Sequence, residues 1–134
     1  HYANLDELIR KSDIISVHTP LTKDTHHLLG DKAFMKMKPG AFIINTSRGA
    51  VIHEKSLIRY LRNGHLGGAG LDVYEFEPRI SEELLEMTNV ILVPHIGTAS
   101  YETRTAMTEE AAYNIIKFYK GVNPPNLINP EVLQ

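Results

Sequence analysis

Arginine, acidic residues and histidine stand just behind apolar runs of this sequence, where strands would end. Arg48 follows one run and His95 another; Asp72 closes a run between them, and Glu75 and Glu77 come next. A guanidinium can bind the carboxylate of an anionic substrate through two parallel hydrogen bonds, and an imidazole can exchange a proton near neutral pH. A carboxylate beside the imidazole favours its charged form. These residue types together predict acid–base chemistry on a small anionic molecule.

Each of these residues also has a plain structural interpretation. His95 could be a structural histidine, Arg48 could bond carbonyls within a tight Ser-Arg-Gly turn, and Asp72 could cap the turn that follows it. A bare α/β structural domain would contain all three, but it leaves their placement behind successive strands unexplained. A shared site accounts for that pattern.

The elements that must position these residues are predicted from hydrophobic patterning. Four apolar runs are continuous, which is typical of strands covered on both faces; they are Ile14–Val17, Ala41–Asn45, Ala69–Val73 and Val90–Val93. Helical patterns cover Leu5–Lys11, Lys32–Lys38, Glu54–Arg62, Glu82–Met87 and Tyr101–Lys120. This alternation predicts an α/β fold with a parallel sheet. Ligands of such sheets bind beyond the carboxyl ends of the strands, which brings the polar residues to one edge.

Several element boundaries carry their own signals. Asn4 with Glu7 has capping-box spacing, Asp31 is expected to cap the second helix, and Ser100 to cap the last. The glycines within residues 64–70 precede a strand, so they predict close backbone packing and not a GxGxxG phosphate loop. The proline-rich residues 123–132 are expected to be extended and to pack on something else.

Composition argues against several classes of function. The chain of 134 residues suffices for one domain with a core, and a net charge of −2 without a basic stripe argues against nucleic acid. No apolar run approaches the roughly 18 residues of a membrane span. The sequence has no cysteine for disulfide or thiolate chemistry, which fits a cytoplasmic enzyme.

The remaining histidines and one acid are expected to be peripheral. His26 and His27 lie in a polar loop, His53 and His65 flank a helix, and all four are interpreted as surface residues. No spacing of His, Asp and Glu predicts a metal site. Glu75 is interpreted as solvated.

Four segments resemble a known family. The stretches "HTPLTKDTHHLLG", "MKPGAFIINTSRGAVI", "GAGLDVYEFEP" and "VPHIGTAS" are similar, in this order and spacing, to the D-isomer-specific 2-hydroxyacid dehydrogenases. Glyoxylate/hydroxypyruvate reductases give the nearest likeness, and phosphoglycerate dehydrogenases come second. The resemblance implies a Rossmann-like parallel sheet with flanking helices. That fold is expected to be incomplete, because the first βαβ unit with its GxGxxG turn is missing.

The resemblance also assigns roles to residues. The family's catalytic arginine, glutamate and histidine fall on Arg48, Glu77 and His95, and Glu77 is preferred to Glu75 because it precedes Pro78. Glu77 would favour the charged form of His95 and fix its tautomer. Positions that bind the cofactor, NAD or NADP, fall on Thr19, Pro20, Thr46, Asp72 and Gly97.

The implied reaction is hydride transfer between NAD(P)H and a small 2-keto or 2-hydroxy acid, with glyoxylate or hydroxypyruvate reduction preferred. D-3-phosphoglycerate dehydrogenase and a non-catalytic, NAD-sensing corepressor-like protein stay open as alternatives. Formate dehydrogenase is disfavoured, because that family pairs its histidine with glutamine. Residues 1–120 are expected to be a partial NAD(P)-binding domain, and residues 121–134 a tail returning toward the substrate domain. A cytoplasmic homodimer without nucleic-acid or membrane partners is implied, and the fragment alone is expected to be inactive.

Overall fold

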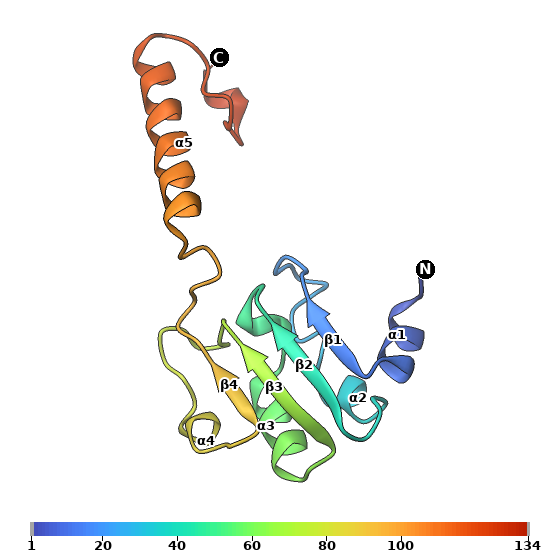
Figure 1. Ribbon diagram of the computed structural model, residues 1–134. Coiled ribbons are helices and arrows are strands. Elements are labelled where there is room, and N and C mark those ends of the chain that lie inside the picture. Colours follow the sequence, from blue (N-terminus) through green and yellow to red (C-terminus); the bar gives the residue numbers. More distant parts are fainter. Residues whose placement is uncertain (1, 134) are drawn as a thin grey trace. The chain divides into compact units, whose positions relative to one another are not determined.

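The computed structural model describes residues 2–133 of the chain, which divides after Gly97 into two compact units. The first unit is built on a parallel four-stranded sheet (Figure 1). Its strands lie in chain order across the sheet: β1 (Ile14–Val17), β2 (Ala41–Asn45), β3 (Leu66–Leu71) and β4 (Val90–Leu92). This confirms the predicted α/β fold, while the expected domain boundary at residue 120 stays a prediction.

Short helices connect and flank these strands. They are α1 (Leu5–Lys11), α2 (Asp31–Phe34), the 3-10 helix η1 (Gly49–Val51), α3 (Glu54–Arg62) and α4 (Glu82–Leu85). Alternate strand residues such as Ile15 and Ile43 are buried together with Phe34 of α2 and Leu57 of α3. Each such side chain contributes about 1.5–3 kcal/mol by leaving water. The core therefore lies between the sheet and these helices.

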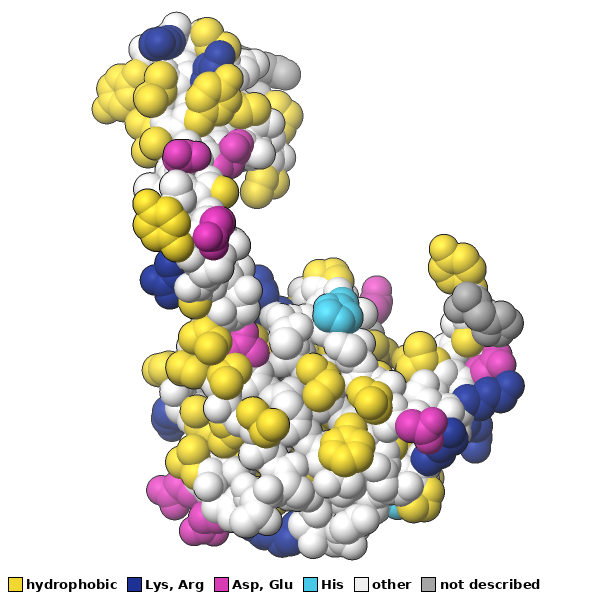
Figure 2. Space-filling model, viewed as in Figure 1, with side chains coloured by type: hydrophobic (Ala, Val, Ile, Leu, Met, Phe, Trp, Pro, Cys, Tyr) yellow, Lys and Arg dark blue, Asp and Glu magenta, His cyan; other side chains and the backbone are white. Residues whose placement is uncertain are grey.

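The other face of the sheet is uncovered among the described residues, contrary to the prediction of strands covered on both faces. Ile14, Phe42 and Ile91 are 64%, 47% and 73% exposed. In Figure 2 apolar side chains lie over the region that the strands occupy in Figure 1. Continuous apolar strands suit burial on both sides, but no helix among residues 2–97 of the first unit packs on this one.

The second helix differs from its prediction. It ends at Phe34 rather than Lys38, because the N–H groups of Lys36 and Met37 bond to carbonyls three residues back and the chain tightens into turns. Gly30 precedes the helix without a side-chain cap. Asp31, expected to be the cap, lies in the first turn, and its carboxylate pairs with Arg59.

The third strand begins earlier than predicted, at Leu66, and includes glycines that were expected to precede it. Their close packing is confirmed. A Cβ atom on Gly67 would lie 2.5 Å from the carbonyl oxygen of Gly40, and one on Gly68 would lie 2.6 Å from that of Asn89. Pairing with β2 and β4 outweighs the low strand propensity of glycine.

Two predicted helix caps are confirmed. Asn4 accepts a hydrogen bond from the N–H of Glu7 at 2.9 Å, and Ser100 accepts one from the N–H of Thr103 at 3.1 Å. Both satisfy backbone donors that a helix start leaves unpaired.

The second unit consists of α5 (Tyr101–Tyr119) and the 3-10 helix η2 (Pro130–Leu133). Asn126 of the tail exchanges hydrogen bonds with Asn114 of α5, at 2.8 and 3.2 Å. The tail therefore docks on the helix within its own unit.

Among residues 2–133, no helix combines the length and apolar character that a membrane crossing requires.

Candidate active site

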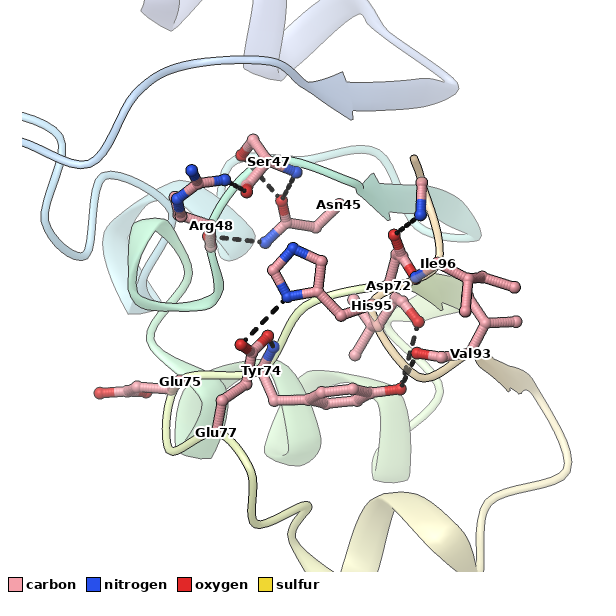
Figure 3. A network of polar contacts seen from close by, with 12 residues as sticks. Asn45, Ser47, Arg48, Asp72, Tyr74, Glu75, Glu77, Val93, His95 and Ile96 are labelled. Carbon is pink, nitrogen blue, oxygen red and sulfur yellow. Dashed lines mark hydrogen bonds and ion pairs between the residues drawn. The ribbon is translucent and has the colours of Figure 1, made fainter. Parts of the chain in front are cut away.

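The turn after β2 is shaped by Asn45, which is 1% exposed. Its Oδ1 accepts hydrogen bonds from the backbone N–H and the hydroxyl of Ser47, at 3.1 and 2.9 Å. Its Nδ2 donates to the carbonyl oxygen of Arg48 at 3.0 Å. A buried amide used in this way fixes the backbone of a turn. The turn thus presents Arg48 at the carboxyl edge of the sheet (Figure 3).

Gly49 brings this turn against the segment that follows β3. A Cβ atom on Gly49 would overlap the backbone carbonyl group of Tyr74. Only glycine permits so close an approach of two backbones. The Arg48 turn is therefore packed directly on the loop that carries Glu77.

Asp72 restrains the loop after β4. This residue is 4% exposed; its Oδ1 accepts a hydrogen bond from the N–H of Ile96 at 2.6 Å and its Oδ2 one from Gly97 at 2.8 Å. The preceding residue, His95, has a φ of 53°. That conformation is uncommon outside glycine and persists where the surroundings enforce it. The two hydrogen bonds to Asp72 supply the restraint.

His95 and Glu77 are in contact across two loops. Nδ1 of His95 lies 3.2 Å from Oε2 of Glu77. Oε1 of the same carboxylate accepts a hydrogen bond from the N–H of Tyr74 at 3.0 Å. The carboxylate is therefore held at one oxygen and presents the other to the imidazole (Figure 3). With Nδ1–H as the donor, Nε2 is the ring atom that can exchange a proton with a ligand.

The side chain of Tyr74 links these two loops. Its hydroxyl donates to the carbonyl oxygen of Val93 at 2.8 Å and approaches that of Leu71 at 3.3 Å. Burial raises the pKa of the Tyr74 hydroxyl above its usual value, and the nearby carboxylates of Asp72 and Glu77 act in the same direction. The hydroxyl therefore remains a hydrogen-bond donor over a wide pH range.

Arg48 lies apart from the contact between Glu77 and His95. Its Nη1 donates to the carbonyl oxygen of Ser47 at 2.6 Å, its one polar side-chain contact among the described residues. An exposed guanidinium bonds to the acceptor within reach, here the neighbouring carbonyl. The structure thus brings together two of the three predicted catalytic side chains, and their catalytic roles stay predictions.

Three of the predicted cofactor-binding residues, Thr19, Pro20 and Thr46, lie together beyond β1 and β2. They line an open hollow of about 550 Å³ with His18, Leu21, Ser47 and Arg48. The hydroxyl oxygen of Thr19 is buried and has no hydrogen-bond partner among residues 2–133. An unpaired buried hydroxyl favours a ligand that supplies a partner. The hollow therefore suits a polar cofactor. Asp72 and Gly97, the other two predicted residues, are bonded to each other beyond β3 and β4.

Glu75 is not solvated, contrary to the prediction. Its side chain is 9% exposed, and its Oε1 lies 2.7 Å from Nε2 of His27. The ring of His27 also stacks on His26 and meets the edge of His53. His65 places its Nε2 2.9 Å from a backbone carbonyl oxygen of α2. His27, His53 and His65 are therefore half-buried and not surface residues. For His27 the cause is backbone pairing with η1, which draws its polar loop inward.

Two residues that shape the site were not found from the sequence: Asn45 and Tyr74. Asn45 carried a signal, an amide that closes an apolar run. Tyr74 carried none, because the partner of its hydroxyl lies 19 residues away along the chain.

The arrangement can perform proton transfer beside an exposed cation. His95 supplies a proton-exchanging nitrogen, Glu77 orients the ring, and Arg48 supplies positive charge at the same sheet edge. Within residues 2–133, no cluster of three or more His, Cys, Asp and Glu side chains is placed to hold a metal ion.

Comparison with known proteins gives consistent matches. Residues 1–97 match the family model described as D-isomer specific 2-hydroxyacid dehydrogenase, NAD binding domain. Over 132 residues the chain is 52% identical to a glyoxylate reductase of Thermococcus litoralis, covering 98% of this chain and 40% of that protein. The chain therefore spans about 40% of the length of the curated relatives it matches.

Solved structures share the fold. A glyoxylate reductase from Paecilomyes thermophila gives a TM-score of 0.83 at 43% identity, over 87% of this chain and 35% of that one. An NADPH-dependent glyoxylate/hydroxypyruvate reductase from Sinorhizobium meliloti, in complex with NADP and malonate, gives a TM-score of 0.82 at 35% identity. The match covers 86% of this chain and 36% of that one. The first unit thus has the architecture found in these enzymes.

Proposed function

Because this chain belongs to the D-isomer-specific 2-hydroxyacid dehydrogenase family, we propose that the full-length protein containing it reduces glyoxylate or hydroxypyruvate with NADH or NADPH. The glyoxylate reductase relatives support this choice of substrate. The observation that carries the proposal is the contact between His95 Nδ1 and Glu77 Oε2, 3.2 Å apart.

The proton chemistry follows from that contact. When a 2-keto acid is reduced, its carbonyl oxygen gains negative charge and must take up a proton. Charged His95 donates that proton from Nε2, and Glu77 favours the charged ring beforehand and holds its orientation. In the oxidation direction the neutral ring takes the proton back. The two directions therefore require opposite protonation states of His95.

Arg48 is proposed to bind the carboxylate of the keto acid. Its guanidinium is exposed and bonded to the carbonyl of Ser47. The planar fork of arginine matches two carboxylate oxygens. Binding in this way fixes the keto carbonyl in one orientation, which is the requirement for reaction at its carbon atom.

When bound, the nicotinamide cofactor supplies the hydride for this reduction. We propose that Thr19, Pro20 and Thr46 hold it from the hollow beyond β1 and β2, and that Asp72 and Gly97 contribute from the ends of β3 and β4. The unpaired hydroxyl of Thr19 supports this assignment. The proposal includes both cofactors. The Sinorhizobium meliloti enzyme was solved with NADP, and the family model is described as an NAD binding domain.

Two further properties stay proposals that rest on the family resemblance. The full-length protein is expected to be a homodimer and to be cytoplasmic. Light scattering on the purified protein and fractionation of the source cells would test them.

The test of the function is turnover by the full-length protein and its His95→Ala variant. We expect NADH- or NADPH-dependent glyoxylate reduction by the wild type and a loss in kcat of about 10²–10⁴-fold in the variant. His65→Ala is the matched control. His65 precedes β3 and therefore lies at the amino end of that strand, whereas the site lies beyond its carboxyl end. Near wild-type kcat in His95→Ala, or a wild type that reduces no 2-keto acid, would contradict the proposal. The 134-residue chain alone is expected to be inactive.

A further inference from the structure

A pair of glutamates locks the loop after β3 to the start of α3. Oε2 of Glu75 accepts a hydrogen bond from the N–H of Glu54 at 2.8 Å, and Oε2 of Glu54 accepts one from the N–H of Glu75 at 3.0 Å. Each carboxylate thus binds the backbone of the other residue, 21 positions away. We call this arrangement the Glu54–Glu75 clamp.

The clamp is largely removed from water. Glu54 is 4% exposed and the side chain of Glu75 is 9% exposed. The hydroxyl of Ser81 donates to Oε1 of Glu54 at 2.5 Å, and Nε2 of His27 lies 2.7 Å from Oε1 of Glu75. Buried carboxylates are costly unless they are hydrogen-bonded. Here all four oxygens have a partner, and the amino end of α3 adds its favourable dipole.

His27 brings a third segment of the chain to the clamp. Its φ is 53°, and its ring lies 3.8 Å from that of His26 and 4.7 Å from that of His53, centroid to centroid. Such backbone strain costs about 1–3 kcal/mol and needs compensating contacts. The bond to Glu75 is one of them. His27 and His95 are the non-glycine residues with positive φ among residues 2–133, and each contacts a glutamate of the same loop.

Beyond Tyr74, whose side chain is buried, few apolar contacts hold that loop. Phe76 is 54% exposed, and residues 77–79 are exposed as well. A segment with little buried apolar surface is positioned mainly by its polar contacts. Glu75 and Glu77 leave the loop in different directions, with Glu77 directed toward His95 (Figure 3).

We propose that Glu75 is a positioning residue, which sets the carboxylate of Glu77 against the imidazole of His95 through the Glu54–Glu75 clamp. This rests on the proposed function, in which Glu77 favours the charged form of His95. Loss of the clamp frees the backbone on which Glu77 is carried. A misplacement of about 1 Å near a reacting group can lower the rate by about 10²-fold.

The test compares three variants of the full-length protein. Glu75→Ala removes both contacts of the side chain. Glu75→Gln retains them, because its amide oxygen can accept from the N–H of Glu54 and its NH₂ group can donate to neutral His27. Glu86→Ala is the control, since Glu86 is exposed at the C-cap of α4 and has no side-chain partner within residues 2–133.

We expect Glu75→Ala to lower kcat for glyoxylate reduction by about 10-fold or more, with a smaller change in KM. Its kcat–pH profile should move to lower pH, because Glu77 no longer supports the imidazolium. Glu75→Gln and Glu86→Ala should stay near wild type. A Glu75→Ala protein with lower Tm but wild-type kcat and pH profile would overturn the proposal, and so would a Glu75→Gln variant as impaired as Glu75→Ala.

His27→Asn takes the place of Glu75→Ala if that variant does not fold. Asparagine tolerates a positive φ, so the substitution removes the contacts of the ring with Glu75, His26 and His53 but leaves the backbone conformation accessible. The proposal predicts that His27→Asn lowers kcat by less than Glu75→Ala does and moves the kcat–pH profile in the same direction. Unchanged kcat and an unchanged pH profile in His27→Asn would overturn it.

A second readout needs no turnover. Nitrogen NMR of the histidine rings in the full-length protein reports the tautomer of His95, for which Nδ1–H is expected beside Glu77. The Glu75→Ala variant should show a mixture of tautomers. Identical spectra would overturn the positioning role. A wild type without keto-acid reduction, together with a tautomer change in Glu75→Ala, would refute the proposed function and support the positioning role.

Discussion

The carboxylate of Asp72 and the backbone N–H of Gly97 are joined by a hydrogen bond of 2.8 Å, and a Cβ atom on Gly97 would lie 3.0 Å from the same oxygen. Asp72 directly follows β3, and Gly97 lies two residues after His95 in the loop after β4. This contact connects two strand ends directly. It explains how His95 keeps a left-handed backbone while its ring reaches Glu77.

Asp72→Asn should loosen that loop. The amide retains one acceptor and places a donor against the second backbone N–H, so one hydrogen bond is lost. An unsatisfied buried group costs about 1–3 kcal/mol, which corresponds to roughly 10-fold faster hydrogen exchange or more at Ile96 and Gly97. The measurement is amide exchange in the full-length protein, with Asp24→Asn in an exposed loop as the control. Equal exchange in wild type and Asp72→Asn would exclude this restraint.

Gly49→Ala should displace the loop that carries Glu77. Its methyl group would overlap the backbone of Tyr74, and overpacking of this kind costs about 1–3 kcal/mol. We expect a lower Tm and lower kcat in the full-length protein. Gly30→Ala is the matched control, because its methyl group would lie 3.6 Å from the nearest atom, the carbonyl oxygen of His27. Equal Tm and kcat in both variants would argue against the close approach.

Tyr74 should make the protein less stable in alkaline solution. Burial raises the pKa of Tyr74 in the folded chain, while a tyrosine in the unfolded chain titrates near pH 10. Above about pH 10 the unfolded state loses this proton first. The stabilisation is therefore complete below that pH and is lost as pH rises through the folded pKa.

Thermal unfolding of the full-length protein between about pH 8 and about pH 11 measures this effect. Tm should fall less steeply in Tyr74→Phe than in wild type. Tyr113→Phe serves as the control, since Tyr113 is 46% exposed and its removal should leave the slope unchanged. If Tm falls with pH as steeply in Tyr74→Phe as in wild type, the Tyr74 hydroxyl does not cause the loss of stability in alkaline solution.

Arg48→Lys should weaken substrate binding. Lysine keeps the positive charge but cannot form the two parallel hydrogen bonds of a guanidinium. A hydrogen bond to a charged group contributes about 1.5–3 kcal/mol, so kcat/KM for glyoxylate should fall by roughly 10- to 100-fold. Steady-state kinetics of the full-length protein check this, with Arg62→Lys on the exposed side of α3 as the control. A kcat/KM ratio close to wild type would remove Arg48 from carboxylate binding.

Much of the fold was predictable because it depends on local pattern. Continuous apolar runs located β1 and β2 at their observed bounds, and a side-chain oxygen before α1 marked its start. The rule that parallel strands end at a common edge then placed His95 and Glu77 close together. The start of β3 was misplaced, because glycines that pair as a strand look like a turn.

The misread parts depend on partners distant in sequence. Glu75 looked solvated among polar neighbours, yet Glu54 and His27 bury it. Such pairings arise only when the loops are placed against one another.

The pH dependence of kcat for keto-acid reduction, compared between the full-length protein and its Glu77→Gln variant, tests the central claim most directly. Glutamine keeps the shape of the side chain and its bond to the N–H of Tyr74, but it lacks the charge that favours the imidazolium of His95. The profile of the variant should move to lower pH, with a lower kcat than the wild type above neutral pH. Superimposable profiles and equal kcat would contradict the role of Glu77 in holding His95 ready to donate its proton.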